Sequence, residues 1–339
     1  MSKVWDPDGV GISNGNYFGF PYSNSESKLV LMSIPWDVTT SYGSGTALGP
    51  KNIVDASTQL DFFHERFPKA WENKIGTLPT DPWIRDTSNI NRVKATSIIE
   101  SLEKGEEPNK ALQVEVNDAC QQLLEKVEEQ ANHWINQGKL IGLVGGDHSV
   151  PLGLMKALDA QHDEWGILQI DAHKDLRQAY EGFTYSHASI MYNALQETSV
   201  NKIVQVGVRD WCQSEADLAE ESDRLKVFSD KRIKTSLLSG QNWKNWCGDI
   251  VKCLPQKVYI SFDIDGLSPE LCPNTGTPVP GGLSFEMVQM LLDEIHDQQK
   301  TIIGFDLVEV TPGENNDWDA NVGARILYEL CQYTLNQHD

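Results

Sequence analysis

The sequence has few basic residues, no long apolar stretch and no basic leader, and each absence excludes a class of protein. It contains 28 Lys and Arg against 49 Asp and Glu, a formal net charge of −21. This balance argues against nucleic acid as a partner and is compatible with the attraction of cationic small molecules. No apolar run approaches the roughly 20 residues that cross a bilayer, and residues 1–8 lack the features of a signal peptide. We therefore expect a soluble, cytoplasmic protein with no membrane partner.

Paired cysteines are also missing. The six cysteines are scattered without the spacing of a zinc site or a disulfide framework, so reduced thiols are expected. At 339 residues and 40% hydrophobic, the chain can bury a large core, and the continuity of its motifs favours a single domain over residues 1–339. Residues 72–108 are polar, proline-containing and weakly periodic, which predicts a surface insertion and not a component of the sheet. No chemistry is assigned to this segment.

Apolar runs alternate with helical patterns along the rest of the chain. Strands are predicted at 28–35, 140–145, 165–171, 202–208, 257–263 and 301–308. Helices are predicted at 112–137, 151–160, 285–298 and 321–335, where apolar residues recur at helical spacing. This alternation is typical of a three-layer α/β/α fold with a mainly parallel sheet. Ligands of such folds bind outside the carboxyl ends of the strands.

The most informative motif follows the apolar run 165–170. Asp171, His173 and Asp175 stand at i, i+2 and i+4, so extended backbone would place all three side chains on one face. Anionic and imidazole groups crowded in this way would repel one another or lack partners without a cation between them. The motif therefore predicts a metal site, and the alternative is a solvated strand end with chance acidic residues.

Two further strand ends carry residues of the same kind. Asp263 and Asp265 stand two apart where the run 258–262 ends, and His148 follows the run 140–144 and a Gly-Gly pair. Four carboxylates and two imidazoles without a thiolate suit a pair of moderately hard divalent ions and disfavour a structural zinc site. Manganese is the expected metal.

Two more residues are candidates for catalysis. His187 follows the central motif on a predicted loop over the site, where it could transfer a proton near neutral pH, and the alternative is a packed or solvated histidine. Glu309 ends the last predicted strand and could clamp a planar cation with two parallel hydrogen bonds. The alternative for Glu309 is a salt bridge at the rim of the sheet.

Four motifs in sequence order resemble those of the ureohydrolase superfamily of arginases and agmatinases. They are Gly145–Ser149, Asp171–Asp175, Ser261–Asp265 with the loop 273–282, and Glu309–Pro312, and the resemblance spans about residues 30–335. It implies a three-layer α/β fold, a centre with two manganese ions, and hydrolysis of a guanidino carbon to urea and an amine.

The resemblance also implies a role for each candidate. One metal would be held by His148, Asp171, Asp175 and Asp263. The other would be held by Asp171, His173, Asp263 and Asp265, so that Asp171 and Asp263 bridge the two. Such a pair of ions lowers the pKa of a bridging water, and the resulting hydroxide attacks the guanidinium carbon. Glu309 would orient the guanidinium, and His187 would deliver a proton to the departing amine.

The loops suggest which guanidino compound is bound. The stretches 176–182 and 186–189 are similar to the agmatinase branch, which disfavours arginine. The loop 39–46 resembles a subgroup that includes hydrolases of free guanidine, some of which use nickel. In that case the hydroxyls of Thr39, Thr40 or Tyr42 would replace contacts to a substrate tail.

Several alternatives stay open at this stage. Arg177 either pairs with Glu181 or meets an anionic tail, as in guanidinobutyrate. Guanidinobutyrase or arginase activity, or a catalytically silent metal-binding relative, are therefore the competing functions. Three residues depart from the family pattern, Lys174, Ser268 and Asn274, and Lys174 is expected to point away from the metals. The resemblance further implies a homotrimer or homohexamer.

Overall fold

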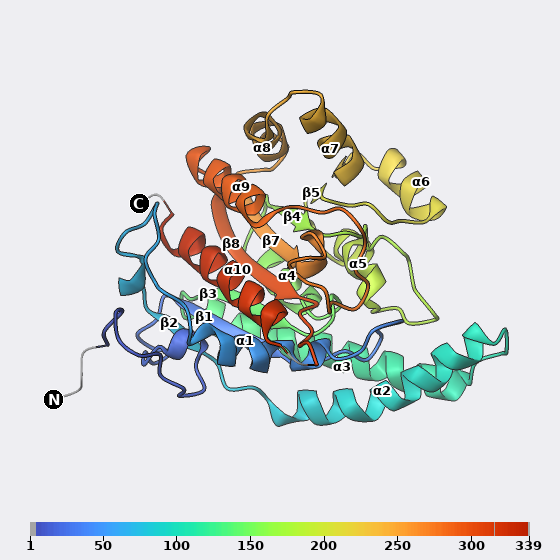
Figure 1. The fold of residues 1–339 in the computed structure, drawn as a ribbon. Helices are drawn as coiled ribbons and strands as arrows, with labels where there is room; N and C mark the ends of the chain where they lie inside the picture. Colours follow the sequence, from blue (N-terminus) through green and yellow to red (C-terminus); the bar gives the residue numbers. More distant parts are fainter. Residues whose placement is uncertain (1–4, 315, 338–339) are drawn as a thin grey trace.

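The computed structural model describes residues 5–314 and 316–337, which fold around one eight-stranded sheet (Figure 1). The strand order is β2-β1-β3-β8-β7-β4-β5-β6, and all the pairings between these strands are parallel. The strands are β1 (Leu29–Ile34), β2 (Ile75–Thr77), β3 (Leu140–Gly145), β4 (Gly166–Ile170), β5 (Lys202–Val206), β6 (Leu225–Phe228), β7 (Lys257–Asp263) and β8 (Thr301–Val308). The predicted parallel α/β fold is confirmed.

Helices cover both faces of the sheet, because its strands are apolar on both sides. One face packs against α1 (Gly49–Ser57), α7 (Asp230–Leu238), α8 (Trp243–Lys252), α9 (Phe285–Asp297) and α10 (Trp318–Leu335). The other face packs against α2 (Pro82–Glu103), α3 (Lys110–Ile135), α4 (Leu152–Asp159) and α5 (Ile190–Glu197), with α6 (Gln213–Glu221) at its margin.

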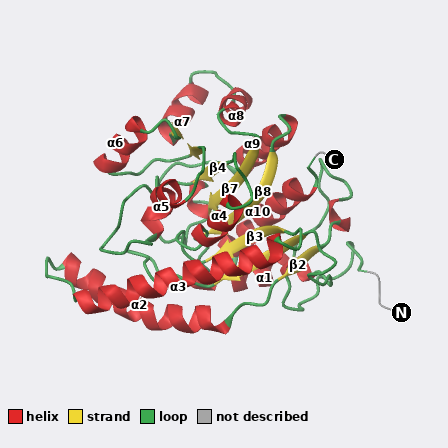
Figure 2. Ribbon diagram, turned by 180° about the vertical axis from the view of Figure 1, so that it is seen from behind, coloured by secondary structure: helices red, strands yellow, loops and turns green. Residues whose placement is uncertain are grey.

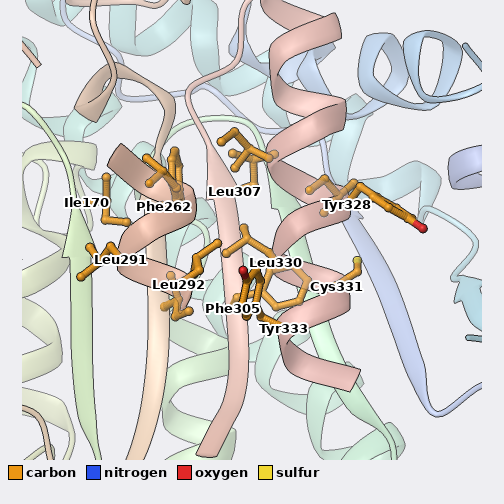
Figure 3. Close-up of a cluster of buried hydrophobic side chains, with 14 of the residues drawn as sticks. Ile170, Phe262, Leu291, Leu292, Phe305, Leu307, Tyr328, Leu330, Cys331 and Tyr333 are labelled. Carbon is orange, nitrogen blue, oxygen red and sulfur yellow. The ribbon is translucent and has the colours of Figure 1, made fainter. Parts of the chain in front are cut away.

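Side-chain alternation along the strands supplies the two cores. In β1, Leu29 and Leu31 belong to one buried cluster, whereas Val30 and Met32 belong to the other. Figure 3 shows the first cluster, where side chains of β8 lie among those of α9 and α10. Burial of each large apolar side chain contributes about 1.5–3 kcal/mol, so the central strands are held firmly in register.

That register aligns the strand ends that matter for function. Ile170 of β4 pairs with Phe262 of β7, so Asp171 and Asp263 follow at neighbouring positions on the carboxyl edge of the sheet. On the other side of β7, β8 ends at Val308, and Glu309 comes next. The sheet therefore brings residues that are far apart in sequence to one edge.

The predicted strands and helices are present, but the sequence did not reveal β2, β6 or several helices. Residues 72–108 were expected to add no strand, and this expectation is wrong, because β2 pairs with β1 at the sheet edge. The same segment contains α2, which lies along α3 (Figure 2) and is joined to it by a 2.8 Å ion pair between Lys94 and Glu115. That the segment is an insertion stays a prediction. Among the described residues, no helix is long and apolar enough to span a bilayer.

Candidate metal centre

The six predicted metal ligands converge at the carboxyl ends of β3, β4 and β7. His148 Nδ1 lies 3.0 Å from Oδ2 of Asp171, 3.0 Å from Oδ2 of Asp175 and 3.3 Å from Oδ2 of Asp263. His173 Nδ1 lies 3.0 Å from Oδ2 of Asp265 and 3.6 Å from Oδ1 of Asp171. Asp171 thus belongs to both groups, which is the arrangement expected for a carboxylate shared by two neighbouring ions.

The surroundings of His148 test whether a metal fits. Its Nε2 is paired with the Ser261 hydroxyl at 2.9 Å, which fixes the plane of the ring. Its Nδ1 is buried and has no hydrogen-bond partner, although three carboxylate oxygens surround it. A lone pair directed between carboxylates in this way is the geometry of a metal ligand, since a cation satisfies all four groups at once. The donor set of oxygen and imidazole nitrogen suits Mn²⁺ or Ni²⁺.

The electrostatics of the site point in the same direction. Burial, together with the carboxylates of Asp265 and Asp171, raises the pKa of Asp263 well above its usual range. Burial and the charge of Asp171 raise the pKa of Asp175 to about 7. Both shifts arise because negative charge is concentrated in a space with little water. Divalent cations would neutralise this charge and return the carboxylates to their ionised form.

The carboxylates are oriented by donors around them. Asp171 accepts hydrogen bonds from Gln169 Nε2 at 2.7 Å and from the His173 backbone N–H at 2.6 Å. The backbone N–H of Asp265 donates to Asp263 Oδ1 at 2.8 Å, in the same way. Such outer contacts fix the direction of each ligand and tune its affinity for metal.

Gln169 and Ser261 were missed by the sequence analysis, although a signal for them existed. Each is a polar residue inside a buried apolar strand, two positions before a ligand aspartate. Alternation in a strand places such a residue on the same face as the ligand that follows it. Asp147, beside His148, accepts a hydrogen bond from the Ser149 backbone N–H at 3.0 Å and so holds the loop.

Backbone strain marks two site residues. Asp175 has a φ of 53° and Glu309 a φ of 63°, in the left-handed region that non-glycine residues rarely adopt. Glu309 is held there by a 2.8 Å hydrogen bond from its N–H to the carbonyl of Gly146. Gly146 itself tolerates no side chain, because a Cβ would lie 1.8 Å from the carbonyl oxygen of Trp36. Strained positions of this kind cluster at functional sites.

A cavity of about 220 Å³ opens above the ligands, and both candidate catalytic residues line it. The backbone N–H of His148 donates to Glu309 Oε1 at 2.8 Å. Burial and the nearby Asp147 raise the pKa of Glu309 well above its usual range. Burial and the neighbouring His173 lower the pKa of His187 to about 3, so its imidazole is neutral. A buried carboxyl group and a neutral imidazole thus face the same space.

The residues predicted to contact substrate divide into two groups. Arg177 lines the cavity, and its guanidinium lies 4.5 Å from the centre of the Tyr180 ring. In the described part of the chain Arg177 forms no direct ion pair with Glu181, although burial raises the pKa of Glu181 and the charge of Arg177 partly opposes that rise. The pairing of Arg177 therefore stays a prediction. Thr39 and Thr40 are buried and do not line the cavity, and their hydroxyls form hydrogen bonds within the protein. Thr39 Oγ1 accepts from the His187 backbone N–H at 3.2 Å, and Thr40 Oγ1 donates to a backbone carbonyl.

Tyr42 requires a correction, because its side chain is 86% exposed and does not line the cavity. The turn of the loop brings Ser41 to the lining instead. Among the departures from the family pattern, Lys174 Nζ lies 5.0 Å from the Trp211 ring centre, away from the carboxylates as expected. Asn274 donates two hydrogen bonds to Asp319, of 2.9 and 2.8 Å, and so ties its loop to α10.

Comparisons with known proteins agree with this geometry. The chain is 31% identical over 309 residues to an N(1)-aminopropylagmatine ureohydrolase of Thermus thermophilus, covering 91% of this chain and 90% of the relative. It is 29% identical to an agmatinase of Neisseria meningitidis, with 93% and 92% of the two chains covered. The solved structure of an agmatine ureohydrolase of Thermoplasma volcanium superposes with a TM-score of 0.72 at 22% identity, covering 96% of this chain and 95% of that one. The model of the Arginase family matches residues 27–332, and the chain therefore belongs to the Arginase family.

Proposed function

We propose that this protein is a metal-dependent hydrolase that converts a small guanidino compound to urea and an amine or ammonia. The observation that carries the proposal is His148 Nδ1, which is buried without a hydrogen bond between three carboxylates. The relatives named as agmatinase and aminopropylagmatine ureohydrolase support the same reaction class. The alternative is a catalytically silent relative. Such a protein would not require a glutamate and a histidine that face the cavity beside the candidate ligands, as Glu309 and His187 do.

The ligand set follows the sequence analysis, with Asp171 and Asp263 bridging two ions. Mn²⁺ is the proposed metal and Ni²⁺ the alternative, since both accept imidazole and carboxylate ligands. When bound, the two ions supply a hydroxide nucleophile near neutral pH by lowering the pKa of water. The buried side chains of Gln169, which donates to Asp171, and Ser261, which pairs with His148 Nε2, keep the ligands aligned for this task.

Glu309 and His187 handle the substrate. Among the described residues, the buried carboxyl group of Glu309 accepts a hydrogen bond only from the His148 backbone N–H. A planar guanidinium would supply the positive charge that favours the ionised form of Glu309 and would be oriented by it. The neutral His187 can accept the proton released by water and pass it from Nε2 to the departing amine, since Nδ1 faces the Ser186 hydroxyl at 3.3 Å. An amine leaves readily only when it is protonated.

The cavity size favours a small substrate, and agmatine or free guanidine are the proposed candidates. Guanidinobutyrate is a second candidate because of Arg177, which stacks on Tyr180 without an ion pair in the described chain and could receive a carboxylate. A cytoplasmic location and a homotrimeric or homohexameric assembly complete the proposal. The six cysteines are all free thiols, which is compatible with a reducing compartment.

The test is urea release from guanidine, agmatine, guanidinobutyrate and arginine, by protein reconstituted with Mn²⁺ or with Ni²⁺ and assayed for metal content. We expect urea from at least one of the first three, and about two ions per subunit. Agmatine and guanidinobutyrate form a matched pair of opposite tail charge, so their ratio reports the role of Arg177. Full metal loading without urea from any of the four compounds would identify a silent relative.

A further inference from the structure

Residues 72–108, to which the sequence analysis assigns no chemistry, form direct hydrogen bonds to a loop that lines the cavity. Ser88 and Arg92 lie one turn apart on the same face of α2, within residues 72–108. Both face the loop 37–46, which precedes α1 and contributes Ser41 to the cavity. The contacts are polar and specific, which distinguishes them from the apolar packing of α2 on α3.

Three hydrogen bonds join α2 to this loop. The backbone N–H of Asp37 donates to Ser88 Oγ at 3.3 Å. Arg92 Nη1 donates to the carbonyl of Val38 at 3.1 Å and also to the carbonyl of Thr40. The guanidinium therefore binds the backbone carbonyls of the residues on both sides of Thr39. Because Arg92 is charged, these bonds are stronger than neutral ones.

Thr39 passes this restraint to His187. It is fully buried, and its Oγ1 accepts the backbone N–H of His187 at 3.2 Å. That N–H begins the short helix His187–Ser189, which carries the imidazole over the metal centre. A displacement of the 38–40 backbone would move the acceptor and release the start of this turn. The imidazole lines the same cavity as Glu309.

We infer that Arg92 is a positioning residue, which sets the location of His187 through Thr39 and thereby the rate of proton transfer. The inference rests on the proposed function for its kinetic consequence. Its structural consequence, a restraint that runs from α2 to 187–189, is independent of catalysis. A misplacement of about 1 Å in a reacting group can cost about 100-fold in rate, so a change in α2 can affect turnover without any contact with substrate.

The experiment compares Arg92→Met with Arg85→Met, a matched control on the same helix. The Arg85 side chain is 68% exposed, and its one ion pair among the described residues is with its sequence neighbour Asp86. Hydrogen–deuterium exchange is followed in peptides covering 36–46 and 183–190, with 285–297 as reference. Arg92→Met is expected to accelerate exchange in the first two peptides only, and Arg85→Met in none. The metal content should stay at the wild-type level. Unchanged exchange in 183–190 with Arg92→Met would overturn the inference.

Kinetics add a coupling test. With the best substrate, Arg92→Met should lower kcat by about 10- to 100-fold with a smaller change in KM, and Arg92→Lys should recover part of the loss. Thr39→Val removes the acceptor, so the double variant should be no slower than the slower single variant. Multiplicative effects would show that Arg92 does not act through Thr39. If the wild-type protein releases no urea, the proposed function fails, while the exchange experiment still decides the inference.

Discussion

The floor of the cavity and its wall on the α2 side are built in different ways. The floor consists of the six candidate ligands at the carboxyl ends of β3, β4 and β7, above strands that are buried on both faces. The wall consists of Ser41 of the loop 37–46 and of His187, and Arg92 of α2 holds the loop in place, so three distant segments contribute to it. Sheet pairing and apolar packing hold the floor, whereas a few hydrogen bonds hold the wall.

The difference predicts two kinds of defect. A change in the floor removes a ligand from a rigid frame, so metal binding and activity are lost together. A change in the wall leaves the metals in place and alters the rate, because single hydrogen bonds contribute only about 0.5–1.5 kcal/mol each and can yield locally. A wall variant that loses its metals, or a floor variant that keeps them, would contradict this distinction.

The largest effect is expected from Asp263→Asn, at a bridging position of the floor. The variant should bind fewer metal ions per subunit and lose at least about 1,000-fold in urea release, because the two-metal site is incomplete. Metal analysis and the urea assay measure this, with Asp249→Asn on the exposed surface of α8 as the control. Full metal loading of Asp263→Asn would show that Asp263 is not a ligand.

His187→Ala should produce the defect typical of the wall. We expect kcat to fall by about 100-fold, because general acid–base catalysis is lost, while the metal content stays at the wild-type level. His133→Ala on the exposed side of α3 serves as the control. If His187→Ala also lost its metals, the assignment of His187 as a proton carrier would be wrong and the separation of floor from wall would fail.

Ser261→Ala tests the support beneath the floor. Loss of the 2.9 Å contact frees the His148 ring, so the affinity for metal should fall by about ten-fold, with kcat recovered at saturating metal. Titration with Mn²⁺ under chelator-buffered conditions gives the affinity. An unchanged affinity would mean that packing alone orients His148.

Tyr42→Ala should have the smallest effect. Its side chain is 86% exposed, so the free energy of unfolding should stay within about 0.5 kcal/mol of the wild-type value and kcat/KM should be unchanged. Chemical denaturation and the urea assay check both. A large loss of activity would show that Tyr42 contacts the substrate and that the substrate site extends beyond the residues that line the cavity in the structure.

Much of the floor could be predicted from the sequence because its pattern is local. The i, i+2 spacing of Asp171 with His173, and of Asp263 with Asp265, marks the carboxyl end of a strand. The pleat itself does not position these pairs, because β4 ends at Ile170 and Asp265 lies in the 3-10 helix Ile264–Gly266. The resemblance to the ureohydrolases, confirmed by the match to the Arginase family, rests on these same motifs. The strand β2 could not be predicted, since three residues carry too little periodicity and the strand exists only by pairing with β1.

Local patterns were enough to predict the parallel α/β architecture and the six metal-ligand candidates, because the positions of strands and of their ends depend on a few consecutive residues. The resemblance of the same motifs to the ureohydrolases supplied the reaction class. Three-dimensional packing was needed to find that Ser41, not Tyr42, lines the cavity, that Ser261 orients His148, and that Arg92 binds the loop 37–46. These contacts join segments that are dozens of residues apart or more. They depend on the relative placement of whole elements, which the order of residues along one strand or helix does not determine.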